Sequence, residues 1–207
     1  MKKAFLTFFS FSFLLLLCNH LQAQNRFDAA LFAGLNVCQI DGDGAGRYNH
    51  PGLRAGVGSS FALSDRKDSP WRLVVELAYT QKGSYIQNTD CRIALQYVEI
   101  PIMLGFNAMD NRLRLAAGVS PALLVGARVT FSGTDDRNHA ANYAPVDWLP
   151  LTATARYRFS DHLCLEGRYQ NSMLSATKVN GSGTYRIFRS NTGSFNRLLT
   201  IGLAWQF

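Results

Sequence analysis

The sequence predicts an all-β fold, an eight-stranded antiparallel up-and-down transmembrane β-barrel preceded by a cleavable signal peptide. The first 23 residues have the form of an export signal, the rest of the chain alternates apolar with polar residues, and the last residue, Phe207, is aromatic. Only helices and closed barrels satisfy every backbone polar group in lipid. An exported chain of alternating strands that enters a membrane must therefore close into a barrel.

The export signal is predicted over residues 1–23. Two lysines precede an apolar run rich in Phe and Leu, and Ala23 supplies the small residue at the cleavage position. The alternative is a lipoprotein signal acylated at Cys18, but Leu17 stands where that signal needs a small residue. We therefore expect a Sec-type signal followed by one outer-membrane β-barrel domain over residues 24–207.

The first four strands are predicted from apolar residues at every second position. The third strand, for example, sets Leu73 and Val75 on one face and Arg72 on the other. In the fourth strand, Leu95 and Tyr97 are out of phase with the apolar residues that follow, which indicates a bulge or a later start. The predicted ranges are 27–37, 53–63, 71–82 and 93–106.

The last four strands show the same alternation. The fifth sets Leu113 and Leu115 against Arg112 and Arg114, and the eighth carries Trp205 on its apolar face. The predicted ranges are 112–125, 149–159, 163–170 and 198–207.

Two prolines, Pro101 and Pro121, fall inside predicted strands of a fold that has no edges. A bulge or a position satisfied by water would accommodate each of them, and the sequence does not decide between the two.

The predicted connections alternate in length. The short ones are 64–70, 107–111 and 160–162, and the long ones are 38–52, 83–92, 128–148 and 171–197. Short periplasmic turns and long extracellular loops are typical of outer-membrane barrels, with both termini on the periplasmic side.

The composition of the two faces distinguishes a membrane barrel from a soluble one of the lipocalin kind. The polar face carries small residues such as Gly34, Gly56 and Ala116, whereas a surface exposed to water would be dense in Lys and Glu. Aromatic residues on the apolar face gather near the strand ends, as interfacial girdles do. They are Trp71, Phe106, Phe159, Trp205 and Phe207 near the turns, and Tyr79 and Tyr169 near the loops.

The polar face also carries charged residues, which need partners inside a barrel. We predict a structural ion-pair network in the lumen, formed by Arg54, Arg72, Glu76, Glu99, Arg114, Arg156, Glu166 and Arg168. The same parity directs further charges inward, namely Asp28, Lys82, Arg112 and Arg158. The alternative is a site for an anion or a lipid A phosphate at a rim. An eight-stranded barrel is just wide enough for side chains, which favours the structural interpretation.

The formal net charge falls from +7 to +5 when Lys2 and Lys3 leave with the signal. Because the sequence contains no run of Lys and Arg, and because an exported chain rarely meets nucleic acid, we expect no nucleic-acid partner. The positive charge is better explained by a paired lumen and by loops near anionic lipopolysaccharide.

No catalytic, cofactor or metal site is predicted. His50 and His139 fall in loops and His162 in a turn, so no His lies near a Ser on a strand as a barrel hydrolase would need. Asp41 and Asp43 with interleaved glycines are a weak calcium-loop pattern that lacks the closing Glu.

Three cysteines remain after removal of the signal. Cys38 and Cys91 are predicted in neighbouring loops at the same end of the barrel, so they form either a disulfide or two buried or reduced thiols. Cys164 is predicted to face the lumen near the periplasmic side, without a partner.

Three segments resemble a known family. Residues 95–104 (LQYVEIPIML) resemble the Y-x-E-I-P strand of PorT-like outer-membrane β-barrel proteins, and residues 116–124 are similar to the strand that follows it. Residues 157–169 resemble the later hairpin of that family. The resemblance implies an eight-stranded barrel of the OmpA or OmpX architecture. For the namesake of the family it implies a part in exporting proteins across the outer membrane.

We therefore expect a non-enzymatic, integral protein of the cell outer membrane that serves as a structural or interaction module with long extracellular loops. The alternative is a component of a protein-secretion apparatus. A narrow channel and a lipid A-modifying enzyme are less favoured. The expected partners are outer-membrane lipid and lipopolysaccharide, the barrel-assembly machinery during insertion, and secretion-system proteins under the alternative.

Overall fold

The computed structural model describes residues 27–41, 48–64, 69–177 and 194–207. The predicted signal peptide lies outside the described residues, as do Asp43 and most of the predicted connection 171–197. Within the described ranges, no helix is long and apolar enough to cross a membrane.

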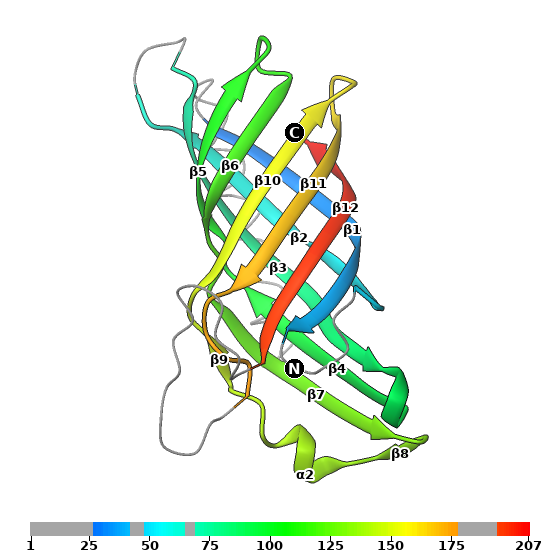
Figure 1. Cartoon of the computed structure of the whole chain (residues 1–207). Helices are drawn as coiled ribbons and strands as arrows, with labels where there is room; N and C mark the ends of the chain where they lie inside the picture. Colours follow the sequence, from blue (N-terminus) through cyan, green and yellow to red (C-terminus); the bar gives the residue numbers. More distant parts are fainter. Residues whose placement is uncertain (1–26, 42–47, 65–68, 178–193) are drawn as a thin grey trace, which may run out of the picture.

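The described strands form a closed antiparallel barrel that crosses its wall eight times (Figure 1). We call each crossing a stave, because some crossings consist of two consecutive strands. Five staves are single strands, the fourth consists of β4 and β5, the fifth of β6 and β7, and the sixth of β9 and β10. Pairing of β12 with β1 closes the ring. The predicted fold class is therefore confirmed.

The strands that build the wall are β1 Phe27–Asp41, β2 His50–Ala62, β3 Trp71–Ile86, β4 Cys91–Glu99, β5 Ile102–Ala108, β6 Leu113–Val119, β7 Ala122–Phe131, β9 Val146–Asp147, β10 Pro150–Arg158, β11 Leu163–Ser172 and β12 Phe195–Gln206. The remaining elements are the 3-10 helix η2 Gln87–Thr89, β8 Thr134–Asp135 and α2 Arg137–Ala140.

The three connections predicted to be short are short, and they define what we call the turn end of the barrel. At the opposite, loop end, the prediction of a long connection over 83–92 is wrong. β3 and β4 continue there as a hairpin, in which Tyr85 and Ile86 pair with Arg92 and Cys91. Only residues 87–90 remain as a turn. β1 and β7 also run farther toward the loop end than predicted.

The prolines coincide with breaks in the staves rather than with bulges. β4 ends before Pro101 and β6 ends before Pro121, and β10 begins at Pro150. The carbonyl groups of the three prolines accept hydrogen bonds of 2.9 Å from the backbone N–H groups of Glu76, Ile100 and Ser120 respectively. Each proline therefore still accepts from the neighbouring stave, although it cannot donate.

The bulge expected in the fourth strand is present in its pairing with β7. The register shifts between Gln96 and Tyr97, which lie opposite Gly126 and Leu124. The extra residue is therefore Val125, on the partner strand. The bulge does not change which residues of the fourth stave face the lumen, because Leu95 and Tyr97 are buried on the same side as Glu99.

The wall of the barrel is apolar outside and polar inside. The outward side chains include Leu35 and Ile201, which are 69% and 71% exposed. Aromatic rings pack side by side at the turn end, where the ring centroids of Trp71 and Phe106 are 5.2 Å apart. Tyr79 also faces outward, farther toward the loop end. This surface has the form of a membrane-facing band with an interfacial girdle at the turn end.

Candidate functional site in the barrel lumen

The middle of the lumen holds a cluster of three guanidinium groups and two carboxylates, which we call the central cluster. Glu76 on β3 contacts Arg54, Arg156 and Arg168 at 2.8, 3.2 and 2.6 Å. Glu166 on β11 contacts the same three arginines, with Arg168 at 3.1 Å and Arg54 at 3.6 Å, and Arg156 forms its closest contact. Every arginine therefore bridges both carboxylates, and the cluster carries one excess positive charge.

A glycine on β2, Gly56, makes room for the aromatic ring that supports Arg54 in this cluster. The ring of Phe32 on β1 lies under the guanidinium of Arg54, 4.3 Å from its carbon to the ring centroid. A Cβ atom on Gly56 would lie 2.7 Å from that ring and 2.2 Å from a backbone oxygen. Only glycine fits at this position, and it allows the aromatic ring to support the arginine inside the lumen.

A second cluster lies toward the turn end. Asp28 on β1 accepts from Arg72 at 2.9 Å and from Arg114 at 2.8 Å, and the Ser60 hydroxyl donates to it at 3.0 Å. Arg114 also donates to the amide oxygen of Asn107 at 2.8 Å. This cluster borders a polar cavity of about 490 Å³ at the mouth of the barrel.

A third cluster lies between the central cluster and the loop end. The carboxylate of Glu99 on β4 is 2.7 Å from the ammonium of Lys82 on β3. It also accepts from the hydroxyl of Thr80 at 3.0 Å and from the amide of Gln170 at 3.2 Å. Because Glu99 is fully buried, this set of donors compensates for its lost hydration.

Beyond Glu99 the lumen becomes mainly apolar, although the polar side chains of Ser84, Asp147 and Asn196 are buried there as well. Leu95 and Tyr97 are completely buried there. They belong to the outer apolar cluster, which consists of Ile40, Cys91, Ile93, Leu95, Tyr97, Ala122, Val129, Tyr143 and Ala176. The ring of Tyr97 also lies 4.9 Å from the ammonium of Lys82, so it separates the apolar layer from the ionic one.

All eight residues of the predicted lumen network lie in the three ionic clusters. Of the further charges expected inside, Asp28 and Lys82 join them. Arg112 does not, because it is exposed at the turn end, and Arg158 lies at the mouth, where it donates to the backbone oxygen of Asn111 at 3.3 Å. Parity did not predict the outer apolar cluster. Its signal was the phase change at Leu95 and Tyr97.

The disulfide considered between Cys38 and Cys91 is absent. Both residues are buried in strands rather than in loops, and β2 and β3 lie between β1 and β4 in the sheet. Cys164 is buried near the turn end. It was predicted to have no partner, but its thiol donates to the side-chain oxygen of Gln206 at 3.7 Å.

His162 and Asp41 have structural contacts. The ring of His162 stacks on Trp205 with centroids 5.1 Å apart, and its Nδ1 is 2.9 Å from the backbone oxygen of Gln206. Asp41 pairs with Arg197 at 3.0 Å. In the part of the chain that the structure describes, no group of three or more His, Cys, Asp or Glu residues could hold a metal ion.

Comparison with known proteins agrees with this architecture. A family model described as the outer membrane protein beta-barrel domain matches residues 22–177. The search of curated protein sequences finds no match. The matched family is defined by the barrel, and its description names no secretion role.

Among solved structures, the chain is similar to Ail, the attachment invasion locus protein of Yersinia pestis. Ail in complex with the heparin analogue sucrose octasulfate is 11% identical, with a TM-score of 0.53 over 88% of this chain and 99% of that chain. Ail without that ligand is 12% identical, with a TM-score of 0.51 over the same shares of the two chains. At these identities the likeness shows the fold alone.

Proposed function

Because this chain belongs to the family of outer-membrane protein β-barrel domains and is integral to the cell outer membrane, we propose that it is a non-enzymatic structural and interaction module. The barrel would anchor the loop-end surface in the membrane and present it to partners outside the cell. The outward apolar side chains contact the lipid of the membrane.

The filled lumen is the observation that carries this proposal. The central cluster links β2, β3, β10 and β11 across the interior, and its carboxylates are almost completely buried. The outer apolar cluster covers the ionic layers at the loop end. Side chains that pack in two successive layers support an anchor rather than a conduit for solutes.

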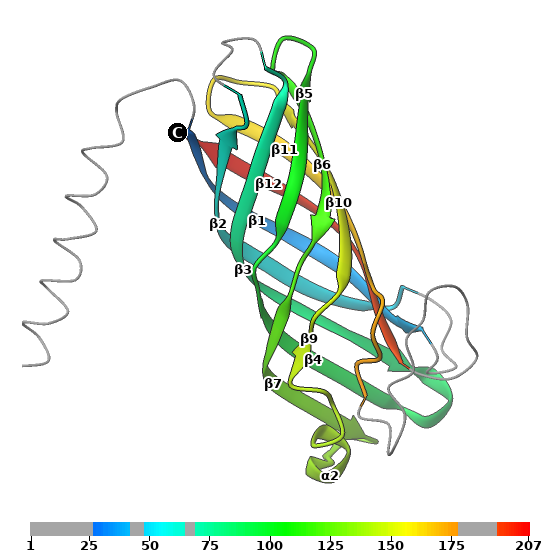
Figure 2. The same cartoon turned by 90° about the vertical axis from the view of Figure 1, so that its left-hand side faces the viewer.

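The loop end offers a surface for partners. β4, β7, β8 and α2 extend past the ends of β10 and β11 (Figures 1 and 2). Tyr85 donates to Asp90 at 2.9 Å, and the guanidinium of Arg92 lies 5.8 Å from the Tyr85 ring. Trp148, which precedes β10, is 66% exposed. Aromatic and arginine side chains are the residue types that dominate protein interfaces.

Planar-bilayer recording tests the structural part of the proposal. The mature protein, reconstituted beside a porin that shows conductance under the same conditions, should produce no steady ion-conducting steps. Reproducible steps from folded protein would contradict an anchor with a filled lumen and would favour the channel alternative.

Two further measurements separate the remaining alternatives. Overexpression should leave the mass spectrum of lipid A unchanged, and a new mass shift that depends on the folded protein would contradict a non-enzymatic role. The secretion role implied by the PorT resemblance stays a prediction. Co-purification of secretion components from outer-membrane extracts would support it over an independent module.

A further inference from the structure

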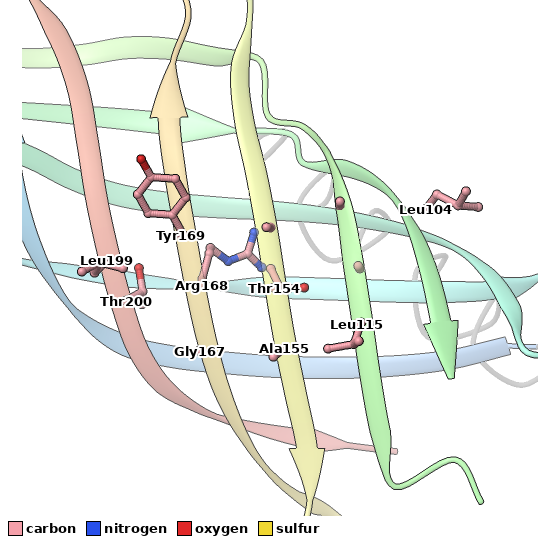
Figure 3. A pocket seen from close by; sticks show the side chains of 12 residues that line it. Leu104, Leu115, Thr154, Ala155, Gly167, Arg168, Tyr169, Leu199 and Thr200 are labelled. Carbon is pink, nitrogen blue, oxygen red and sulfur yellow. The ribbon is translucent and has the colours of Figure 1, made fainter. Parts of the chain in front are cut away.

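The membrane-facing wall contains a groove over β6, β10, β11 and β12. It is a shallow, open depression of about 660 Å³ that is lined almost entirely by apolar atoms. Its floor consists of small residues on adjacent strands, where Ala153 pairs with Ala117 and Ala155 with Gly167. Larger side chains surround this floor, among them Leu104, Leu115, Tyr169 and Leu199 (Figure 3). Large apolar side chains therefore border a floor of small residues in this part of the outer surface.

The space above the groove floor is open. A Cβ atom built on Gly167 would meet no heavy atom within 4 Å, whereas a Cβ on Gly34, Gly118 or Gly202 would collide with backbone. Glycine at position 167 is therefore not required by packing within the barrel. A groove in the hydrocarbon region with an apolar lining suits an apolar chain as its occupant.

A polar hollow lies at the turn end of the same staves, between the β5–β6 turn and the β10–β11 turn. It encloses about 740 Å³. Its charged residues are two arginines and two aspartates, Arg112, Arg158, Asp110 and Asp161, and Tyr157 and Phe159 flank them. Among the described residues, none of these four charged groups has an ion-pair partner. Asp110 and Arg158 also line the cavity at the mouth of the barrel, where Arg158 donates to the backbone oxygen of Asn111. The hollow therefore offers two cations and two anions at the edge of that mouth.

The hollow and the groove follow one another along the seam between β6 and β10. The backbone N–H of Arg158 donates to the carbonyl of Arg112 at 2.7 Å, so the two arginines are neighbours across the seam. Toward the loop end, Tyr157 pairs with Leu113, and Ala155 with Leu115. Three residue steps along the strand, roughly 10 Å, thus separate Arg158 from Ala155, the small residue that begins the groove. The aromatic girdle marks the level of the headgroups at this end.

We propose that the hollow and the groove together bind one glycerophospholipid of the turn-side leaflet, with a phosphoethanolamine headgroup. The phosphate would accept from Arg112 and Arg158, and the ammonium group would donate to Asp110 and Asp161. One acyl chain would lie over Ala155 and Gly167. A zwitterionic headgroup matches two charges of each sign, which neither a purely anionic lipid nor a second copy of the barrel wall would satisfy.

Native mass spectrometry of the delipidated mature protein in detergent tests this site. Titration with dioleoylphosphatidylethanolamine should give a single bound lipid. Dioleoylphosphatidylcholine should bind about tenfold more weakly, because its quaternary ammonium cannot donate hydrogen bonds to the aspartates. The double substitution Asp110→Asn with Asp161→Asn should remove this preference.

Matched substitutions test the roles of the two arginines and of the groove. Arg112→Gln with Arg158→Gln should weaken phosphatidylethanolamine binding by about tenfold or more, whereas Arg128→Gln at the loop end should leave it unchanged. Gly167→Val adds a side chain whose Cβ has no heavy atom within 4 Å, so it occupies part of the groove and should weaken binding several-fold. Ala55→Val, on the outward face of β2, is its control. Circular dichroism and heat-modifiable migration verify folding, and Ala155→Val replaces Gly167→Val if that variant does not fold.

Three outcomes would overturn the site. They are equal affinity for the two lipids in the wild type, wild-type binding after both arginines are replaced, and a protein dimer that forms in place of the lipid complex and is lost in Gly167→Val. The last outcome would assign the groove to a second copy of the chain.

Discussion

Side chains fill both the middle and the loop end of the lumen, but those in the middle are ionic and those at the loop end are mainly apolar. In the middle, Glu76 and Glu166 share three arginines, and nearly all of these side-chain atoms are removed from water. At the loop end, Leu95 and Tyr97 fill the interior with apolar atoms and one hydroxyl. Both regions belong to one continuous antiparallel ring, so the fold does not dictate the chemistry of its interior.

Because the two layers differ in chemistry, substitutions in them should lower the stability of the barrel for different reasons. An ionic layer depends on every member, because removal of one partner leaves a buried charge uncompensated. An apolar layer loses only the contacts of the atoms removed, plus the free energy of the cavity that remains. The predictions below separate these two behaviours.

The largest loss of stability is expected from Glu76→Ala. The substitution leaves Arg54, Arg156 and Arg168 with one shared carboxylate and should lower the free energy of unfolding by about 3–5 kcal/mol. Urea titration in lipid vesicles measures this. Glu76→Gln, which keeps the side-chain volume, controls for the cavity and should also destabilise because the negative charge is lost. A loss below about 1 kcal/mol for both variants would show that the central cluster is hydrated.

A smaller loss is expected from Leu95→Ala in the outer apolar cluster. It should cost about 3 kcal/mol through lost burial and the cavity that remains. Leu95→Met, which nearly conserves volume, should stay within about 1.5 kcal/mol of the wild type. Equal unfolding free energies for the Ala and Met variants would mean that the side chain at position 95 is not packed in the lumen.

Removal of the Tyr97 hydroxyl should have a modest effect. Its hydrogen bond with the side-chain amide of Asn196 is long, at 3.5 Å. Tyr97→Phe should therefore lower the free energy of unfolding by about 1 kcal/mol in the same titration. A loss above about 3 kcal/mol would place the hydroxyl in a stronger polar network than this one contact.

The smallest effect is expected when the Lys82–Glu99 pair is replaced as a whole. Lys82→Met with Glu99→Gln should change stability by less than about 1 kcal/mol, because buried pairs are often no better than neutral residues of similar size. Lys82→Met alone should cost about 3 kcal/mol, since Glu99 then keeps only Thr80 and Gln170 as partners. A double-mutant cycle measures both, and additive losses would show that the two charges do not interact.

Much of the barrel could be predicted from the period-2 pattern. Alternation placed the eight staves and directed Arg54, Glu76, Arg156, Glu166 and Arg168 inward, because each strand has one lipid-facing side. Alternation cannot say at what height along the axis two inward residues meet. The division into three ionic clusters depends on the register between staves, which the sequence does not show.

The errors have physical causes as well. Residues 83–92 were predicted as a loop because polar residues interrupt the pattern, yet β3 and β4 pair there outside the apolar band, where alternation is not needed. The phase change at Leu95 and Tyr97 was attributed to backbone geometry. It arises because the interior itself becomes apolar at this height. Pro101 and Pro121 interrupt their strands, but the hydrogen bonding between neighbouring staves continues because the proline carbonyl groups still accept.

The orientation of the fourth stave is the most direct test of the two-layer lumen. Nitroxide labels placed singly at positions 94–105, in a protein with Cys38, Cys91 and Cys164 replaced by serine, report oxygen accessibility in lipid vesicles. We predict high accessibility at even positions and low accessibility at odd positions, without a change of phase from Leu95 to Gly105. A reversal of phase near Tyr97, with Leu95 exposed to lipid, would contradict an apolar outer layer in the lumen.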